Sequence, residues 1–183
     1  GELAVYSNHG LALAGYIVER LAKMPYEAYI EKNLLEPLEM KQTAVRQPVP
    51  AALTKDLSVG YRYVDGEHKA EFFEFMPASP AGAVSASAVD MAHFMIAHLD
   101  DGRYGQARIL SAATARQMRT RLFAEVPELN GMMYGFQQLD RNGRRVYGHA
   151  GATQWFHSQV ALLPDNDVGI FVSYNTDTGE AAR

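Results

Sequence analysis

The stretch SQVALLPDNDVGIFVSY, residues 158–174, contains two apolar runs separated by a group of turn-forming residues. The runs 158–163 and 168–174 each have the length of a β-strand, and Pro164–Asp167 between them is typical of a turn. The run from Val168 to Val172 is apolar at successive positions, which predicts a strand that is buried on both faces. The stretch therefore predicts two antiparallel strands, the second of which lies centrally in a sheet.

A second strand pair is predicted immediately upstream. Residues 133–139 and 144–150 flank Asp140-Arg141-Asn142-Gly143, in which the Asn-Gly pair is a strong signal for a tight hairpin. Helical periodicity lies further upstream, mainly within residues 10–35 and 87–100. Helices followed by an antiparallel meander predict an α+β fold, and the length of 183 residues suits a single domain.

Two helices have clear start signals. Ser7 or Asn8 can cap a helix over about 10–23, whose apolar residues recur at helical spacing. Ser87, followed three residues later by Asp90, resembles a capping box at the start of the 87–100 helix. The apolar stripes expected to face the core are Ala14, Ile17, Val18, Leu21 and Ala22 in the first helix, and Ala92, Met95, Ile96 and Leu99 in the second. Residues 46–82 contain several prolines, so we expect an extended excursion there and not a second domain.

Composition excludes several functional classes. The chain has a formal net charge of −4, which argues against a nucleic-acid partner, and it has no cysteine, which excludes disulfides and thiolate metal sites. The six histidines do not follow a metal-ligand spacing, so we expect neither a metal nor a cofactor. No run approaches the roughly 20 apolar residues that a membrane span needs.

Three short segments contain residues that can do chemistry. Tyr6 and Asn8 lie two residues apart before a helix, where they could face one cleft, although a buried tyrosine and a helix cap would look the same. Glycines flank His149 in Gly148–Thr153, which would let a ligand approach the backbone closely, unless this is an ordinary exposed turn. Trp155, the only tryptophan, lies beside Phe156 and His157, a pattern that strand packing also explains.

In sequence order, these segments resemble the serine β-lactamase and penicillin-binding-protein-like hydrolases, in particular the class C, DD-peptidase and esterase branch. The resemblance extends over essentially the whole chain, 1–183, and implies the C-terminal part of one such domain, with an antiparallel sheet and flanking helices. The matching blocks are Gly1–Asn8 with the helix at 13–19, Leu35–Thr43, Pro80–Met95, and Gly148–Gly151 leading through Pro164-Asp165 to Asn175.

The resemblance implies a role for each site residue. Tyr6 would act as general acid or base beside the nucleophile, and Asn8 would bind the substrate and the catalytic lysine. His149 would occupy the position of the third family motif, where relatives have Lys-Thr-Gly or a histidine variant. The remaining implied roles belong to Gly151, which gives clearance beside the acyl group, Ala152, whose N–H is an oxyanion donor, and Ala150 and Trp155, which contact substrate.

The family's Ser-x-x-Lys motif is missing from this sequence. No serine is followed three residues later by lysine; the serines are Ser7, Ser58, Ser79, Ser85, Ser87, Ser111, Ser158 and Ser173. Since that motif lies upstream of Tyr-x-Asn in the family, we expect an incomplete domain that is inactive alone and self-associates through exposed core. The alternative is a non-catalytic binding or scaffold domain. The family resemblance implies a serine hydrolase that acts through an acyl-enzyme on a small-molecule or peptide substrate, namely a β-lactam, a D-amino-acid peptide or an ester. It also implies a periplasmic or other extracytoplasmic location.

Overall fold

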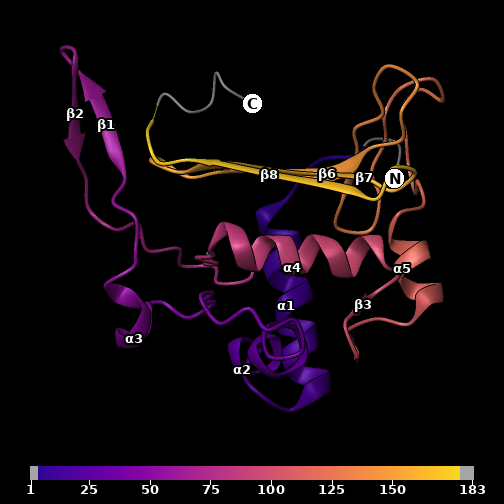
Figure 1. Cartoon of the computed structure of the whole chain (residues 1–183), viewed down its shortest axis with the longest axis horizontal. Helices are drawn as coiled ribbons and strands as arrows, with labels where there is room; N and C mark the ends of the chain where they lie inside the picture. The colour runs from indigo at the N-terminus through magenta and orange to yellow at the C-terminus, as the bar shows by residue number, and fades with distance from the viewer. Residues whose placement is uncertain (1–3, 178–183) are drawn as a thin grey trace.

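The computed structural model describes residues 4–177, which form a four-stranded antiparallel sheet with helices against one face (Figure 1). The helices are α1 (Asn8–Ala22), α2 (Tyr26–Ile30), the π-helix η1 (Glu31–Leu35), α3 (Ala51–Thr54), α4 (Ala88–Leu99) and α5 (Ala112–Met118). The strands are β1 (Tyr61–Val64), β2 (Glu67–Ala70), β3 (Arg103–Tyr104), β4 (Ala107–Arg108), β5 (Gln137–Gln138), β6 (Tyr147–Ala152), β7 (His157–Leu163) and β8 (Val168–Tyr174). The prediction of an α+β fold with a C-terminal antiparallel sheet is confirmed.

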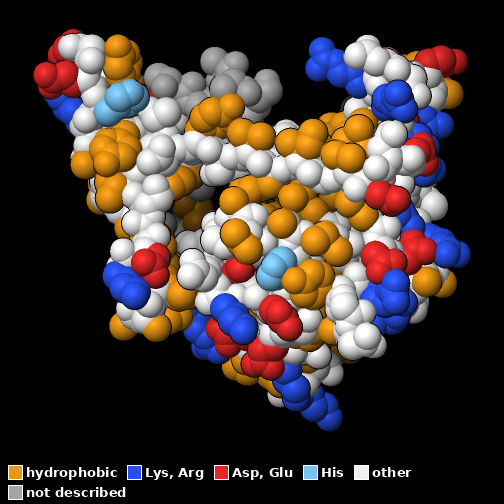
Figure 2. Space-filling view, in the orientation of Figure 1, with side chains coloured by type: hydrophobic (Ala, Val, Ile, Leu, Met, Phe, Trp, Pro, Cys, Tyr) orange, Lys and Arg blue, Asp and Glu red, His pale blue; other side chains and the backbone are white. Residues whose placement is uncertain are grey.

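The main sheet has the order β5-β6-β7-β8, so β8 lies at its edge within residues 4–177. The prediction that Val168–Val172 forms a central strand is therefore wrong. Gly169 and Phe171 face α4, whereas Val168, Ile170 and Val172 lie on the opposite face and are 37% to 49% exposed. Strand β8 therefore has apolar residues on both faces, but among the described residues only the face toward α4 is covered. Figure 2 shows hydrophobic side chains along the sheet layer between two projections of the molecule.

Helix α4 lies against the sheet and contacts β7 and β8 (Figure 1). Ser87 caps it as predicted, because its hydroxyl accepts a hydrogen bond from Asp90 N–H at 3.1 Å. Its core-facing stripe was predicted correctly for Met95 but not for Ile96, which is 48% exposed. The core between α4 and the sheet consists of Met95, Phe136, Tyr147 and Leu162.

Helix α1 is capped by Ser7, whose hydroxyl accepts a hydrogen bond from Gly10 N–H at 3.0 Å. Its predicted core-facing stripe is wrong in part: Ile17 is 48% exposed and Leu21 is 80% exposed. The helix instead turns the buried Gly15 toward Pro80, so closely that a Cβ atom at position 15 would lie 2.4 Å from the proline ring. Glycine at this position permits the approach, and much of the apolar stripe is left outside the described core.

The segment before α4 is tied to the segment after η1. Ala44 and Ser85 exchange two backbone hydrogen bonds of 2.8 and 2.9 Å. The Asp90 carboxylate is buried and accepts hydrogen bonds from the Gln42 N–H and the Thr43 hydroxyl, each at 2.7 Å. Asp90 thus uses its carboxylate to join two segments that are far apart in the sequence, a contact that the capping-box pattern does not predict.

Two projections rise on the sheet side of the molecule (Figure 1). One is the hairpin of β1 and β2, which turns at Asp65-Gly66 and lies within the predicted excursion. The other includes the predicted Asn142-Gly143 turn, in which both residues have positive φ angles of 52° and 71°. Strand β5 is shorter than the predicted 133–139. Among residues 4–177, no helix is both long and apolar enough to cross a bilayer.

Candidate active site

The structure brings Tyr6 and His149 together although they are far apart in the sequence. Tyr6 lies just before α1, and its ring centroid is 5.5 Å from that of His149, with the two ring planes tilted by 45°. The Tyr6 hydroxyl donates a hydrogen bond to Asn8 Oδ1 at 2.9 Å. Because Tyr6 is 53% exposed, this group of three side chains opens to solvent. Gly1–Leu3, which begin the first matching block, lie outside the described residues.

Strand β6 positions His149. Its neighbour Tyr147 is buried toward α4 and donates a hydrogen bond to the His98 carbonyl at 3.3 Å, and alternation along the strand places His149 on the same face. His149 Nδ1 lies 2.5 Å from the Ala150 carbonyl oxygen. A carbonyl can only accept, so Nδ1 bears the hydrogen of this contact, and Nε2 is the ring nitrogen left for another partner.

The second half of β6 has an open edge. On one side it pairs with β7 along its whole length, from Tyr147 opposite Leu162 to Ala152 opposite His157. On the other side β5 pairs only with Tyr147 and Gly148. Backbone N–H groups alternate between the two edges of a strand, and Thr153 N–H bonds toward β7, so the N–H of Ala152 points to the open edge. Within residues 4–177, no strand pairs with β6 there.

Two glycines of β6 lie close to β7, and Gly148 is the one that the neighbouring backbone requires. A Cβ atom at Gly148 would lie 1.9 Å from the Val160 carbonyl oxygen, and one at Gly151 would lie 2.9 Å from the Ser158 hydroxyl. Gly148 therefore allows β6 and β7 to meet in this register. Gly151 keeps the strand free of a side chain beside the open edge, between Ala150 and Ala152.

Trp155 packs inside the molecule and does not point outward from the strand end. It is 9% exposed, forms an edge-to-face contact with Phe72, and would clash with a Cβ atom at Gly60. Trp155 thus packs in the interior from the loop between β6 and β7, and not from a strand as the packing interpretation expected. Sequence reasoning missed Glu74, whose carboxylate accepts the N–H groups of Gln154 at 2.9 Å and Trp155 at 3.1 Å. Glu74 holds the loop that follows Ala152, and no local pattern around it predicts this contact.

Behind the sheet, His98 lies buried in α4 between the rings of Phe94 and Phe136. Burial lowers the pKa of His98 from 6.5 to about 4, and the nearby Arg119 cation contributes to this shift in the same direction. His98 is consequently neutral at physiological pH and supports the core below Tyr147. Among the described residues, no group of three or more His, Asp or Glu side chains is arranged to hold a metal ion.

Comparison with known proteins decides the family. The model of the Beta-lactamase family matches residues 1–183. The chain belongs to the beta-lactamase family. It is 29% identical to Penicillin-binding protein 4 of Amycolatopsis lactamdurans, over 94% of this chain and 49% of that protein. These matches place the chain in the superfamily of hydrolases that includes beta-lactamases and penicillin-binding proteins, as the resemblance implied.

Solved structures confirm the beta-lactamase and penicillin-binding-protein fold. The octameric penicillin-binding protein homologue from Pyrococcus abyssi superimposes with a TM-score of 0.83 at 26% identity, over 96% of this chain and 39% of that one. A class C beta-lactamase superimposes with a TM-score of 0.78 at 19% identity, over 94% of this chain and 52% of that one. The chain thus spans about half the length, or less, of these relatives.

Proposed function

We propose that this chain forms the substrate-binding and proton-transfer part of a serine hydrolase site that acts through an acyl-enzyme. The nucleophilic serine would come from a Ser-x-x-Lys segment outside these 183 residues. The observation that supports this most strongly is the contact between Tyr6 and His149, because the residues at two family motif positions meet in space. A chain that had only kept the fold would have no need for that contact beside an open strand edge.

Each side chain has a place in the proposed reaction. The serine hydroxyl attacks the substrate carbonyl and forms a carbon–oxygen bond, while Tyr6 relays the serine proton. The bond between the carbonyl carbon and the leaving group then breaks, the leaving group departs with that proton, and water afterwards hydrolyses the acyl-enzyme ester. The N–H of Ala152 at the open edge of β6 would bind the developing oxyanion. Asn8 accepts the Tyr6 hydrogen bond at 2.9 Å and thereby orients the phenol. The absence of a side chain at Gly151 would leave clearance for the acyl group.

We further propose that the substrate is an ester or a small amide, and that β-lactams are poor substrates. Relatives place a lysine and a hydroxyl residue where this chain has His149 and Ala150, and that pair suits a substrate carboxylate. His149 already donates its Nδ1 hydrogen to the Ala150 carbonyl. The Nε2 atom is then the ring nitrogen left for the substrate, in place of the permanently charged lysine of those relatives. The site would therefore favour substrates that lack a carboxylate at this position.

The test of the mechanism uses the longer coding sequence upstream of Gly1. If that sequence encodes Ser-x-x-Lys in frame, Tyr6→Phe in the longer protein should lower the acylation rate by about 10²–10⁴-fold. Tyr16→Phe is the matched control, because Tyr16 is exposed to a similar extent on α1. A decrease of less than about threefold would remove Tyr6 from the mechanism.

The test of substrate preference compares kcat/KM for benzylpenicillin with that for a short-chain p-nitrophenyl ester. We expect the ester to be preferred, and we expect His149→Lys/Ala150→Thr to shift the preference toward penicillin. Efficient penicillin turnover that the double substitution leaves unchanged would contradict the proposal. The alternative function, a binding or scaffold domain, predicts that no in-frame Ser-x-x-Lys lies upstream.

Location and self-association are part of the same proposal. Members of this family typically act outside the cytoplasm, which suggests a periplasmic or other extracytoplasmic location. The similar Pyrococcus abyssi protein is octameric. In this chain, Ile17 and Leu21 on α1 and Ile170 on β8 are about half exposed or more, and they offer apolar surface for self-association.

A further inference from the structure

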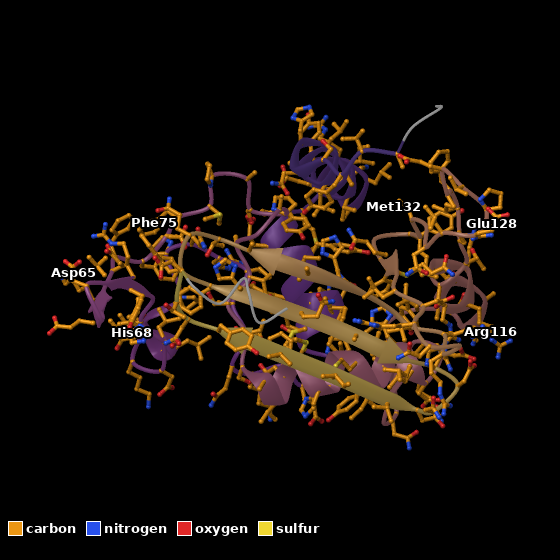
Figure 3. All side chains as sticks on the ribbon, turned by 90° about the horizontal axis from the view of Figure 1, so that it is seen from above. Asp65, His68, Phe75, Arg116, Glu128 and Met132 are labelled. Atoms are coloured by element: carbon orange, nitrogen blue, oxygen red, sulfur yellow. The ribbon has the colours of Figure 1, made fainter. Side chains whose placement is uncertain are left out.

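A hollow of about 450 Å³ lies between the loop at 121–130 and the hairpin at 138–145, and neither Tyr6 nor His149 lines it. Its charged lining consists of Arg121, Arg141, Arg144, Arg145, Glu128 and Asp140. In Figure 3, Glu128 lies at the opposite end of the molecule from Asp65 and His68. Figure 2 shows several Lys or Arg side chains on the projection at the upper right. A chain with a net charge of −4 thus concentrates positive charge at one hollow.

Two charged groups of the hollow already have hydrogen-bond or ion-pair partners within the protein. Asp140 accepts hydrogen bonds through both carboxylate oxygens, from Val146 N–H at 2.8 Å and from the Gln138 amide at 2.6 Å. Arg145 donates two hydrogen bonds to Asp165, at 3.0 and 2.7 Å. These groups are committed to the folded structure and are not the ones that would bind a ligand.

Arg141 and Arg144 are different. Both are exposed, and among residues 4–177 neither side chain has a hydrogen-bond or ion-pair partner. The tight turn at Asn142-Gly143 places them directly opposite one another, since each donates its backbone N–H to the other's carbonyl, at 3.1 and 2.9 Å. Like charges directly opposite in an antiparallel pair destabilise it, and an anion held between them would relieve the repulsion.

The remaining lining is polar and suits hydroxyl groups. Asn142 supplies an amide donor and acceptor and Asn130 supplies its amide oxygen, whereas the Gln138 amide is already bonded to Gly131 and Asp140. Glu128 has a carboxylate without an ion-pair partner among the described residues. Guanidinium groups bind carboxylates and phosphates through paired hydrogen bonds. The lining is mainly polar, with Pro127 and Leu129 as its apolar members, and it therefore suits a hydroxyl-rich ligand.

We propose that this hollow binds an oxyanion carried on a hydroxyl-rich scaffold, namely a carboxylated or phosphorylated glycan, through Arg141 and Arg144. The Asn142 amide, the Asn130 amide oxygen and Glu128 bind the neighbouring hydroxyls. The arginine hairpin leads directly into β6, which starts at Tyr147 and ends at the open edge near Tyr6. The hollow is thereby a glycan-anchoring site at the hairpin that precedes β6. Its lining does not include the residues of the proposed catalytic site.

The test is isothermal titration of the 183-residue chain at low salt with four probes: tetragalacturonate, pentamannose 6-phosphate, neutral maltotetraose and an oligothymidylate. The test variant is Arg141→Gln/Arg144→Gln. The control variant, Arg20→Gln/Lys69→Gln, removes the same charge from exposed positions on α1 and β2. Thermal unfolding of each variant, followed by circular dichroism, verifies that it is folded.

We expect saturable binding of at least one anionic glycan, weakened about tenfold or more in the test variant and less than about twofold in the control. Binding of tetragalacturonate alone identifies carboxylate as the recognised group, and binding of the phosphorylated glycan alone identifies phosphate. The proposal is overturned if neither glycan binds, if maltotetraose binds equally well, or if both variants lose the same affinity. Tighter binding of the oligothymidylate than of either glycan also overturns it.

Discussion

Replacement of the buried His98 by leucine should remove most of the loss of stability between pH 7.5 and pH 5. His98 is 5% exposed, and its ring lies 4.4 Å from that of Phe94 and 5.1 Å from that of Phe136, centroid to centroid. Leucine retains an apolar side chain in this environment and cannot be protonated. The Tyr147 hydrogen bond is kept, because it goes to the backbone carbonyl of residue 98.

The magnitude follows from the pKa of His98, which burial lowers from 6.5 to about 4. The unfolded chain binds the proton more readily than the folded protein, so this contribution to stability is complete above pH 6.5 and is lost as the pH falls toward 4. At about 1.4 kcal/mol per pKa unit, lowering the pH from 7.5 to 5 costs about 2 kcal/mol. Arginine partners lower the pKa values of Asp101 and Glu31 below the usual 3.8 and 4.5. The contributions of these two carboxylates to stability are therefore lost mainly below about pH 5.

The assay is urea unfolding followed by circular dichroism at the two pH values. The unaltered chain should lose about 2 kcal/mol of unfolding free energy between them, and His98→Leu less than about 0.5 kcal/mol. His9→Gln, at an exposed position at the start of α1, is the control and should behave like the unaltered chain. Equal losses in the unaltered chain and in His98→Leu would show that His98 is not the group responsible.

Three further outcomes are expected. Gly148→Ala should lower the unfolding free energy by about 3 kcal/mol in urea titrations, because the alanine Cβ would lie 1.9 Å from the Val160 carbonyl oxygen. An unchanged midpoint would show that β6 and β7 can move apart to accommodate it. Asp90→Ala should cost a similar amount, about 3 kcal/mol by the same assay, because it leaves buried donors without an acceptor. Ile17→Gln/Leu21→Gln should lower the sedimentation-derived mass if α1 drives self-association, and an unchanged associated mass would exclude this helix.

The local signals in the sequence predicted the secondary structure that depends on neighbouring residues. Ser7 and Ser87 cap the helices that they were expected to cap, and Asn142-Gly143 forms a tight turn. These features depend on hydrogen bonds and φ angles within a few residues, which a sequence displays directly.

Features that depend on distant partners were predicted less well. The apolar run at 168–172 could not reveal that only one face of β8 is covered, and the stripe on α1 gave no sign that Gly15 would be the buried residue. Glu74 bonds to a loop that is distant in the sequence, and no spacing rule relates the two. The proximity of Tyr6 and His149 was expected only from the family resemblance.

The most direct test of the proposed function is covalent labelling of the longer protein encoded upstream of Gly1 with a fluorophosphonate or a fluorescent penicillin, followed by mass-spectrometric mapping of the modified residue. We predict a label on the serine of an upstream Ser-x-x-Lys, a much slower reaction after Tyr6→Phe, and no label on the 183-residue chain alone. A label on Ser7, Ser158 or any other serine of this chain would contradict the proposed function, as would an unlabelled longer protein that contains Ser-x-x-Lys.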